Sequence, residues 1–375
     1  MKTQRCFARI SLDNLIHNFS VIRSLCPSDC RIMPIIKADG YSHGAVEIAK
    51  ALSPYTDIFA VAELEEALQL RSAGIDAEIL ILGYTTPDAA LTLSDYSLTQ
   101  TVMSLEYADA LAESLGASRL RVHLKLDTGM HRFGFDSEAP ETLEEIRAVT
   151  EIPCFDVTGM FTHFCESDDL ASDFTRLQLD RFNKTVEELK AMGIEIPNLH
   201  CANSAAVLTL PESHMNLVRP GLILYGAYPS RAVKEQYLSL HPDKPLREVM
   251  TLSSRIAQIH SVKRGEGIGY SRTHTFERDS VVATVSAGYA DGIPRSLSNK
   301  GEVTVNSRRY RIVGNVCMDL VMIDITGHEH EVFVGDEVQF WGENSVSVDE
   351  YADIADTINY TLYTGVTKRV VKIYE

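Results

Sequence analysis

The sequence predicts an α/β protein, with a (β/α)8 TIM-type barrel followed by a mainly β C-terminal domain. Between residues 30 and 225, short apolar β-prone runs alternate with amphipathic helical stretches. Eight such units favour a closed barrel over an open sheet. After about Pro245 the rhythm changes to short β-prone segments divided by Gly, Asn and Asp, a pattern typical of a mainly β domain. We therefore expect the barrel over residues 11–240 and the second domain over 245–375.

The expected strands of the barrel are short, and helical patterns lie between them. They lie at residues 31–36, 58–61, 78–82, 99–103, 120–126, 156–161, 198–201 and 216–218. The clearest helical spacing is that of Leu170, Phe174, Leu177, Phe182, Val186 and Leu189. In the second domain the β-prone segments are 255–261, 280–285, 302–305, 309–313, 320–325 and 337–340. Residues 1–10 predict an extra strand, which fits either domain and which we group with the second.

Composition narrows the class of protein. The 375 residues are 45% hydrophobic and 23% charged, which is ordinary for a globular protein. A formal net charge of -17 argues against nucleic-acid or anionic-membrane partners. The seven cysteines lack paired metal-ligand spacing and predict reduced thiols in a cytoplasmic protein. We expect no signal peptide and no membrane segment, because the sequence has no apolar run of about 18 residues.

Polar residues follow several of the expected strands, where a barrel of this type places its chemistry. Lys37 follows the first strand, residues 125–132 close the fifth, and residues 162–163 close the sixth. Residues 200–204 and 219–221 close the last two. One polar strand end is common, but five together are not. The sequence therefore predicts a functional site at this end of the barrel.

Lys37 is the most informative of these residues. It ends an apolar run, and a turn rich in Gly and Asp follows at once, with a helical pattern opening near His43. A lysine at the mouth of a buried strand is partly desolvated, which favours the neutral amine that forms Schiff bases. Most lysines are solvated surface residues. The position of Lys37 at a strand end is therefore what favours a functional role for it.

These same stretches resemble the alanine racemase family, whose enzymes use pyridoxal 5'-phosphate (PLP) on a barrel followed by a β domain. The resemblance covers nearly the whole chain, and its order and spacing are highly specific. The matching segments are residues 34–44, 125–135, 159–164, 200–205, 219–226, 288–292, 316–319 and 358–360.

The resemblance implies a role for each catalytic candidate. Lys37 would hold PLP and serve as the base on one face of the substrate, with Tyr270 as the base on the other. In the family this tyrosine comes from the other subunit, so a homodimer with shared sites is implied. Arg219 would face the pyridine nitrogen, and because arginine only donates, it weakens the ring as an electron sink. His163 and Arg219 would support the tyrosine, which by sequence alone could instead belong to the β core.

The resemblance also implies how PLP and a small amino-acid substrate are held. Arg132 would contact PLP and the substrate carboxylate, oriented by Lys125, which the family often carbamylates. The alternative to this role is an ordinary ion pair between Lys125 and a nearby carboxylate. Met318 would face the substrate, or else be core. The cofactor contacts would come from Lys37, Tyr41, Ser204, Arg219, Gly221, Leu222 and Tyr360. Ser204 could also be a helix N-cap.

Departures from the family pattern lie beside the expected site. Asn315 and Leu320 stand where arginine and glutamine are common, and His131 and Ser271 replace frequent glycines. These four differences are compatible with racemisation, but they bear on which substrate is preferred and on the rate.

We expect interconversion of L- and D-alanine, which in this family usually supplies peptidoglycan synthesis. The alternative is a serine racemase of the same family, including the soluble domain of a membrane-anchored version; the crowding expected from Tyr360 favours alanine. A PLP-dependent decarboxylase would prefer an acidic partner for the pyridine nitrogen, so Arg219 argues against it. A non-catalytic PLP-binding protein would lack the second domain that carries Tyr270. No metal is expected.

Overall fold

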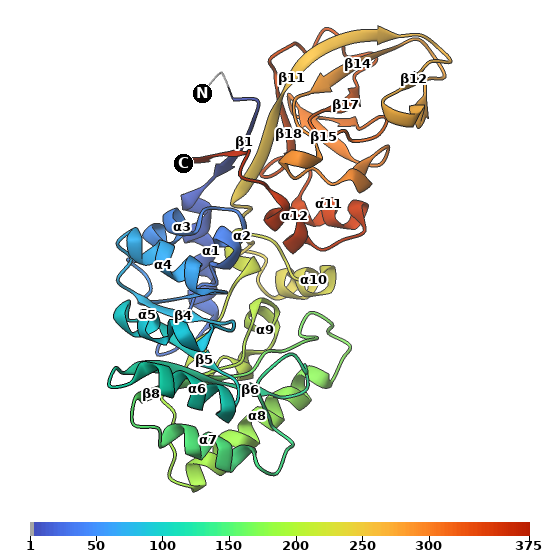
Figure 1. The fold of residues 1–375 in the computed structure, drawn as a ribbon. Coiled ribbons are helices and arrows are strands. Elements are labelled where there is room, and N and C mark those ends of the chain that lie inside the picture. The colour runs from blue at the N-terminus through green and yellow to red at the C-terminus, as the bar shows by residue number, and fades with distance from the viewer. Residues whose placement is uncertain (1–3) are drawn as a thin grey trace.

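The computed structural model describes residues 4–375 and contains the expected barrel (Figure 1). Six strands form one parallel sheet in the order β3-β4-β5-β6-β8-β9, and β7 adds to β6. With β7 this sheet has seven strands: β3 (Ile58–Val61), β4 (Glu78–Ile81), β5 (Thr99–Val102), β6 (Leu120–Asp127), β7 (Phe135–Asp136), β8 (Phe155–Phe161) and β9 (Asn198–His200). The parallel pair β2 (Arg31–Ile32) and β10 (Leu217–Val218) closes the barrel.

Single contacts join this pair to the larger sheet. Ile35 forms a parallel bridge with Ala60 of β3, and the Arg219 N–H donates to the Ala202 carbonyl at 3.0 Å. The first strand is shorter than the expected 31–36, because Pro34 has no N–H to donate to a ladder. The Pro34 carbonyl still accepts from the Ala60 N–H at 3.0 Å, and the Met33 and Ile35 N–H groups donate to the carbonyls of Val218 and Pro220 at 2.9 Å, so the chain continues along the barrel wall beyond β2.

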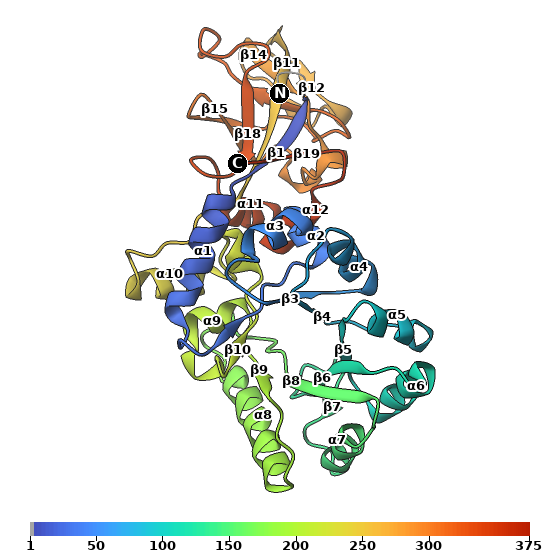
Figure 2. The ribbon, with the colours of Figure 1, turned by 90° about the vertical axis from the view of Figure 1, so that its left-hand side faces the viewer.

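Helices surround the barrel strands (Figure 2). They are α1 (Leu12–Leu25), α3 (Ala45–Leu52), α4 (Leu64–Ser72), α5 (Ala90–Asp95), α6 (Leu105–Leu115), α7 (Thr142–Thr150), α8 (Phe174–Ala191), α9 (Ser204–Thr209) and α10 (Arg231–Leu240). The helical spacing predicted around residue 180 is α8, which buries Phe182 and Leu189, whereas Leu170 precedes the helix. Every residue of β3 is buried, as expected for a strand between a packed barrel interior and a helical layer.

The C-terminal domain is built on a second sheet, whose central path runs β16-β15-β18-β11-β1-β19; β14 pairs with β11, and β17 pairs with β14. Its strands are β1 (Cys6–Ile10), β11 (Met250–Val262), β14 (Ser280–Val285), β15 (Glu302–Val305), β16 (Arg308–Arg311), β17 (Val321–Asp324), β18 (Glu337–Trp341) and β19 (Val371–Tyr374). A small hairpin, β12 (Gly267–Ile268) and β13 (His274–Thr275), lies near the far end of this domain (Figure 1).

Both ends of the described chain enter this second sheet. Strand β1 pairs antiparallel with β11 and parallel with β19. Two helices that the sequence rhythm did not predict, α11 (Val348–Ala355) and α12 (Asn359–Gly365), connect β18 to β19 and lie toward the barrel (Figures 1 and 2). We keep 11–240 and 245–375 as proposed domain boundaries. Among residues 4–375, no helix is both long and apolar enough to cross a membrane.

Candidate active site

A cavity of about 630 Å³ lies at the carboxyl ends of the barrel strands, where α12 of the second domain also reaches it. Among its lining residues are Lys37, Tyr41, Lys125, Arg132, Phe161, His163, Ser204, Arg219, Gly221 and Tyr360. The structure thus brings together most of the predicted site residues, from segments up to 323 positions apart in sequence.

The turn after Lys37 has an uncommon backbone conformation. Ala38, Asp39 and Gly40 have φ of 52°, 53° and 62° with ψ between 43° and 49°, a short left-handed helical turn. Tyr41 and Ser42 also have positive φ. Each non-glycine residue in this conformation costs about 1–2 kcal/mol, so neighbouring contacts must hold the turn in place.

Contacts from several parts of the chain hold this turn. The Ala38 N–H donates to Glu66 Oε1 at 2.5 Å. Asp39 Oδ1 accepts from the Ala45 N–H at 3.0 Å, capping the start of α3, and Asp39 Oδ2 pairs with Lys372 of β19. The turn that follows Lys37 is therefore anchored to both domains.

The environment of Lys37 favours its neutral amine. Burial lowers the pKa of Lys37, and the positive charge of Arg132 lowers it further, while Glu66 partly opposes both. This is the direction expected from the position of the lysine at a strand end. A lower pKa increases the share of nucleophilic amine near neutral pH.

Arg219 is buried and held by a dense set of acceptors. Nη1 donates to the Nδ1 and carbonyl oxygen of His200 at 2.9 and 2.7 Å. Nη2 donates to the carbonyls of Thr162 and Cys201 at 2.7 and 2.9 Å, and lies 3.5 Å from Nδ1 of His163. Burial lowers the pKa of Arg219 to about 10, so the guanidinium stays charged at neutral pH. The cavity thus contains a fixed cation that can only donate.

One end of the cavity is lined by hydroxyl and backbone N–H groups. The Gly221 N–H donates to Ser204 Oγ at 2.9 Å. A Cβ at position 221 would lie 2.8 Å from the Tyr41 hydroxyl, so the site needs a glycine for space. The Tyr41 and Tyr360 rings are 5.9 Å apart, and burial raises the pKa of Tyr360 to about 12, which keeps its phenol protonated. Such donors fit the phosphate of PLP.

The expected cap role of Ser204 belongs to its neighbour. Asn203 is the N-cap of α9, and its side chain accepts from the Ala206 N–H at 3.2 Å, while Ser204 is the first helical residue. The Ser204 hydroxyl therefore accepts from the Gly221 N–H and does not cap the helix.

Lys125 is a second buried lysine of the cavity. Burial lowers its pKa to about 7, with Arg219 and Arg132 lowering it further against the opposing charge of Asp127. Its Nζ donates to the Leu126 carbonyl at 2.7 Å rather than to a carboxylate. Arg132 lies on the exposed side of the same cavity.

Three predicted residues do not line this cavity. Tyr270 lies in the turn between β12 and β13 and is 71% exposed, so it is not part of the β core. Its carbonyl accepts from the Asn315 side chain at 2.9 Å. Met318 is 52% exposed, which excludes the core alternative within this chain. Leu222 is fully buried directly after Gly221.

Comparison with known proteins identifies the family. The family model described as alanine racemase, N-terminal domain, matches residues 10–229, and that for the C-terminal domain matches residues 249–374. The chain belongs to the alanine racemase family. Alanine racemase of Carboxydothermus hydrogenoformans is 42% identical over 98% of this chain and 99% of its own length. That of Methanococcus maripaludis is 38% identical over all of both chains.

Solved alanine racemases share the fold. The alanine racemase of Clostridium difficile superposes with a TM-score of 0.93 at 37% identity, covering 100% of this chain and 96% of that one. The Bacillus anthracis alanine racemase with bound L-Ala-P gives 0.91 at 32% identity, covering 99% and 95%. The barrel and the mainly β domain predicted from the sequence are therefore confirmed, and so is the prediction of a racemase-type enzyme.

Some residues that shape this cavity have no distinctive signal in the sequence. Glu66, which bonds the backbone after Lys37, gave no signal because it lies within an ordinary helical pattern. Phe161 was placed only at the end of a strand, yet its ring faces Lys125 and Arg219 at 5.7 and 5.3 Å. His200 and Arg219 close the last two predicted strands of the barrel, and this shared position is the sequence signal that could have indicated their contact.

Proposed function

We propose that the protein interconverts L- and D-alanine, with PLP held on Lys37 and a second base supplied by Tyr270 of the partner subunit. The observation that supports this most strongly is the pair of Lys37 and Arg219 in one cavity at the barrel mouth. One is a buried lysine with a lowered pKa, and the other is a buried arginine that only donates.

The cavity residues fit PLP. When bound, PLP would supply the electron sink that makes the substrate α-proton removable. The hydroxyls of Tyr41, Ser204 and Tyr360 would hold its phosphate end, together with the backbone near Gly221 and Leu222. Arg219 would donate toward the pyridine nitrogen and keep it unprotonated, which disfavours transamination and decarboxylation.

Racemisation needs proton transfer on both faces of the substrate carbon. Lys37 would move the proton on one face, and its lowered pKa suits a base near neutral pH. Tyr270 is exposed and is not among the residues that line the cavity of its own chain, so it does not serve the other face there. A head-to-tail homodimer would bring Tyr270 of the partner subunit to this cavity, next to His163 and Arg219, and Met318 of the partner subunit to its rim.

The substrate would be a small amino acid. Arg132 would bind the carboxylate, and a carbamate on Lys125 would orient that arginine. Tyr360 lines the cavity and limits the room for a side chain, which favours alanine over serine. The usual role in the family, supply of D-alanine for peptidoglycan in the cytoplasm, is the role that we propose.

Borohydride reduction of the PLP-loaded protein, followed by peptide mapping, tests the central assignment. A label on Lys37 is expected, and a label on any other lysine would refute it. Racemisation of L-alanine and L-serine should then be compared, and a higher kcat/KM for serine would overturn the substrate proposal.

The two-base proposal needs a separate variant. Tyr270→Phe should reduce racemisation of alanine by about 100-fold or more, because general-base catalysis contributes about 10²–10⁴-fold. Tyr96→Phe changes an exposed tyrosine outside the segments that match the family and serves as the control. Equal activity of the two variants would exclude Tyr270 as a base.

A further inference from the structure

A buried chain of polar side chains leads from Arg219 through the interior of the barrel. His200 Nδ1 lies 2.9 Å from Arg219 Nη1, and His200 Nε2 lies 3.0 Å from His123 Nδ1. His123 Nε2 in turn lies 3.9 Å from Glu78 Oε1. The two histidines and Arg219 are almost completely buried, and the Glu78 side chain is 14% exposed. The chain therefore links the cavity to the opposite part of the barrel.

The two ends of this chain fix the direction of its hydrogen bonds. Arg219 can only donate, so His200 must accept at Nδ1 and carry its proton on Nε2. His200 then donates to His123 Nδ1, which leaves the proton of His123 on Nε2. That nitrogen is fully buried, has no closer partner, and points to the Glu78 carboxylate, which can only accept.

Both rings are neutral in this arrangement. Burial lowers the pKa of His123 to about 3 and that of His200 well below its ordinary value, and the nearby arginines act in the same direction. A second proton on either ring would also set two donors against each other. A single tautomer of each histidine therefore satisfies the whole chain.

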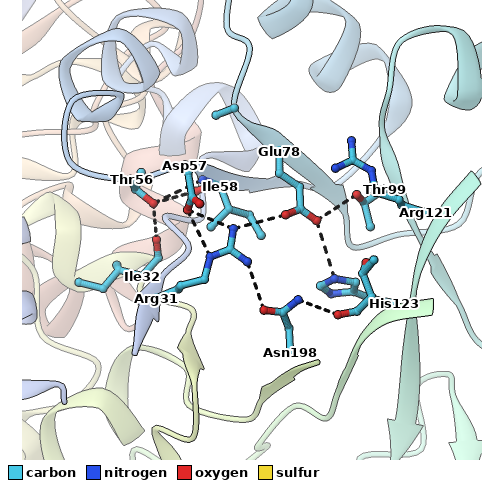
Figure 3. Close-up of polar contacts among 12 residues, drawn as sticks. Arg31, Ile32, Thr56, Asp57, Ile58, Glu78, Thr99, Arg121, His123 and Asn198 are labelled. Atoms are coloured by element: carbon cyan, nitrogen blue, oxygen red, sulfur yellow. Dashed lines mark hydrogen bonds and ion pairs between the residues drawn. The ribbon is translucent and has the colours of Figure 1, made fainter. Parts of the chain in front are cut away.

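Glu78 is itself fixed at the start of β4 (Figure 3). Its Oε2 pairs with Arg31 Nη2 at 3.4 Å, and its Oε1 accepts from the Thr99 hydroxyl at 3.2 Å. Arg31 also binds Asp57 Oδ1 at 3.1 Å and Asn198 Oδ1 at 3.2 Å. The carboxylate thus has a partner for its charge and a defined orientation.

Close packing prevents the rings from turning away. A Cβ at Gly159 of β8 would lie 2.5 Å from the His123 ring, so this position has a glycine to make space for the imidazole. Two positions later, Phe161 stacks on His200 with ring centroids 4.8 Å apart and an interplanar angle of 12°. Both rings are therefore packed against residues of β8.

We propose that Glu78 is a positioning residue for Arg219, acting through His123 and His200. The carboxylate selects the histidine tautomers that accept from the guanidinium, and so keeps it fixed at the cavity. The expected effect of Glu78 on catalysis rests on the proposed racemase function. The tautomers expected for His123 and His200 do not depend on that function.

Histidine-selective ¹⁵N NMR of the PLP-loaded protein tests the tautomers directly. Signals are assigned from His123→Gln and His200→Gln, and protonated and bare nitrogens are distinguished by their chemical shifts. We expect both rings to carry their proton on Nε2 from pH 6 to pH 8. A proton on Nδ1 of either ring would overturn the proposal, even if the protein racemises alanine.

Variants of Glu78 test the effect on Arg219. Glu78→Ala should lower kcat for alanine about five- to tenfold with little change in KM, and should alter the absorption band of bound PLP, because misplaced catalytic groups reduce rate rather than binding. Glu78→Gln keeps an acceptor and should recover most of kcat. Asp57→Asn is the control, since it removes another partner of Arg31 and leaves the histidines untouched.

The outcomes are distinguishable. If Glu78→Ala matches Asp57→Asn in kcat and in the PLP spectrum, Glu78 does not position Arg219. If Glu78→Ala does not fold, Gly159→Ala interrupts the series of hydrogen bonds between Glu78 and Arg219 by displacing His123. Its kcat and PLP spectrum are then compared with those of Asp57→Asn in the same way. A wild-type protein without racemase activity would refute the proposed function, while the NMR result would still decide the tautomers.

Discussion

Replacing the buried Lys125 with methionine should make the stability of the protein less dependent on pH. Burial lowers the pKa of this lysine from 10.5 to about 7 in the folded state. Between these values the unfolded chain binds more protons than the folded one, so folding must release a proton, and this cost shrinks as pH rises. Below about pH 7 the lysine is charged in both states and the cost is constant.

The magnitude follows from the two pKa values. At 1.36 kcal/mol per pH unit, the lowered pKa of Lys125 costs about 4 kcal/mol of stability at pH 7 and about 2 kcal/mol at pH 9. Lys125→Met removes this cost. The difference in free energy of unfolding between the variant and the wild type should therefore be about 2 kcal/mol smaller at pH 9 than at pH 7. Loss of the hydrogen bond to Leu126 adds a constant offset that cancels in this comparison.

Urea unfolding of the PLP-free proteins at pH 7 and pH 9 measures this difference. Buffers should be free of carbon dioxide, because a carbamate on Lys125 would remove the titrating amine. Lys190→Met, which changes an exposed lysine of α8, is the control and should show no pH-dependent difference from the wild type. A constant difference between Lys125→Met and wild type at the two pH values would refute the reasoning.

Three further predictions concern single positions. Gly221→Ala should weaken PLP binding about tenfold or more in absorbance titrations, because the new methyl meets the Tyr41 hydroxyl, while Gly365→Ala, which meets no atom within 4 Å, should not. Ala38→Gly should raise the free energy of unfolding by about 1 kcal/mol in urea, since glycine adopts the left-handed turn without a steric penalty; a destabilised variant would contradict this. Burial raises the pKa of Glu248 to about 8, so the charge of this group makes stability fall from about pH 4.5 to pH 8. Glu248→Gln should flatten that slope and gain about 3 kcal/mol at pH 7; an unchanged slope would exclude the assignment.

The location of the site could be predicted from the sequence because the carboxyl ends of parallel strands meet at one face of a barrel. Lys37, His163 and Arg219 each follow a strand, so their convergence required only the fold class. The left-handed turn after Lys37 could not be predicted, because Ala38 and Asp39 have no strong preference for that conformation and are held in it by Glu66 and by distant parts of the chain.

Other features depended on contacts that spacing does not encode. Glu78 and His123 lie on different strands, and no motif or spacing in the sequence connects them to Arg219, so only the three-dimensional structure shows their alignment with it. Helices α11 and α12 were missed because short β-prone segments surround them. Tyr270 was assigned by resemblance, and its exposed position within one chain is a geometric fact that no local pattern predicts.

The anchoring of the Lys37 turn to β19 has a consequence for dissecting this protein. A fragment ending near residue 240 would keep every barrel strand and Lys37 itself, yet it would lose Lys372 as the partner of Asp39 and Tyr360 as the neighbour of Tyr41. It would also leave β1 without both strands that flank it. Lys37 lies in the barrel sequence, but the conformation of the turn that follows it depends on the whole chain, so we expect the isolated barrel not to reproduce this site.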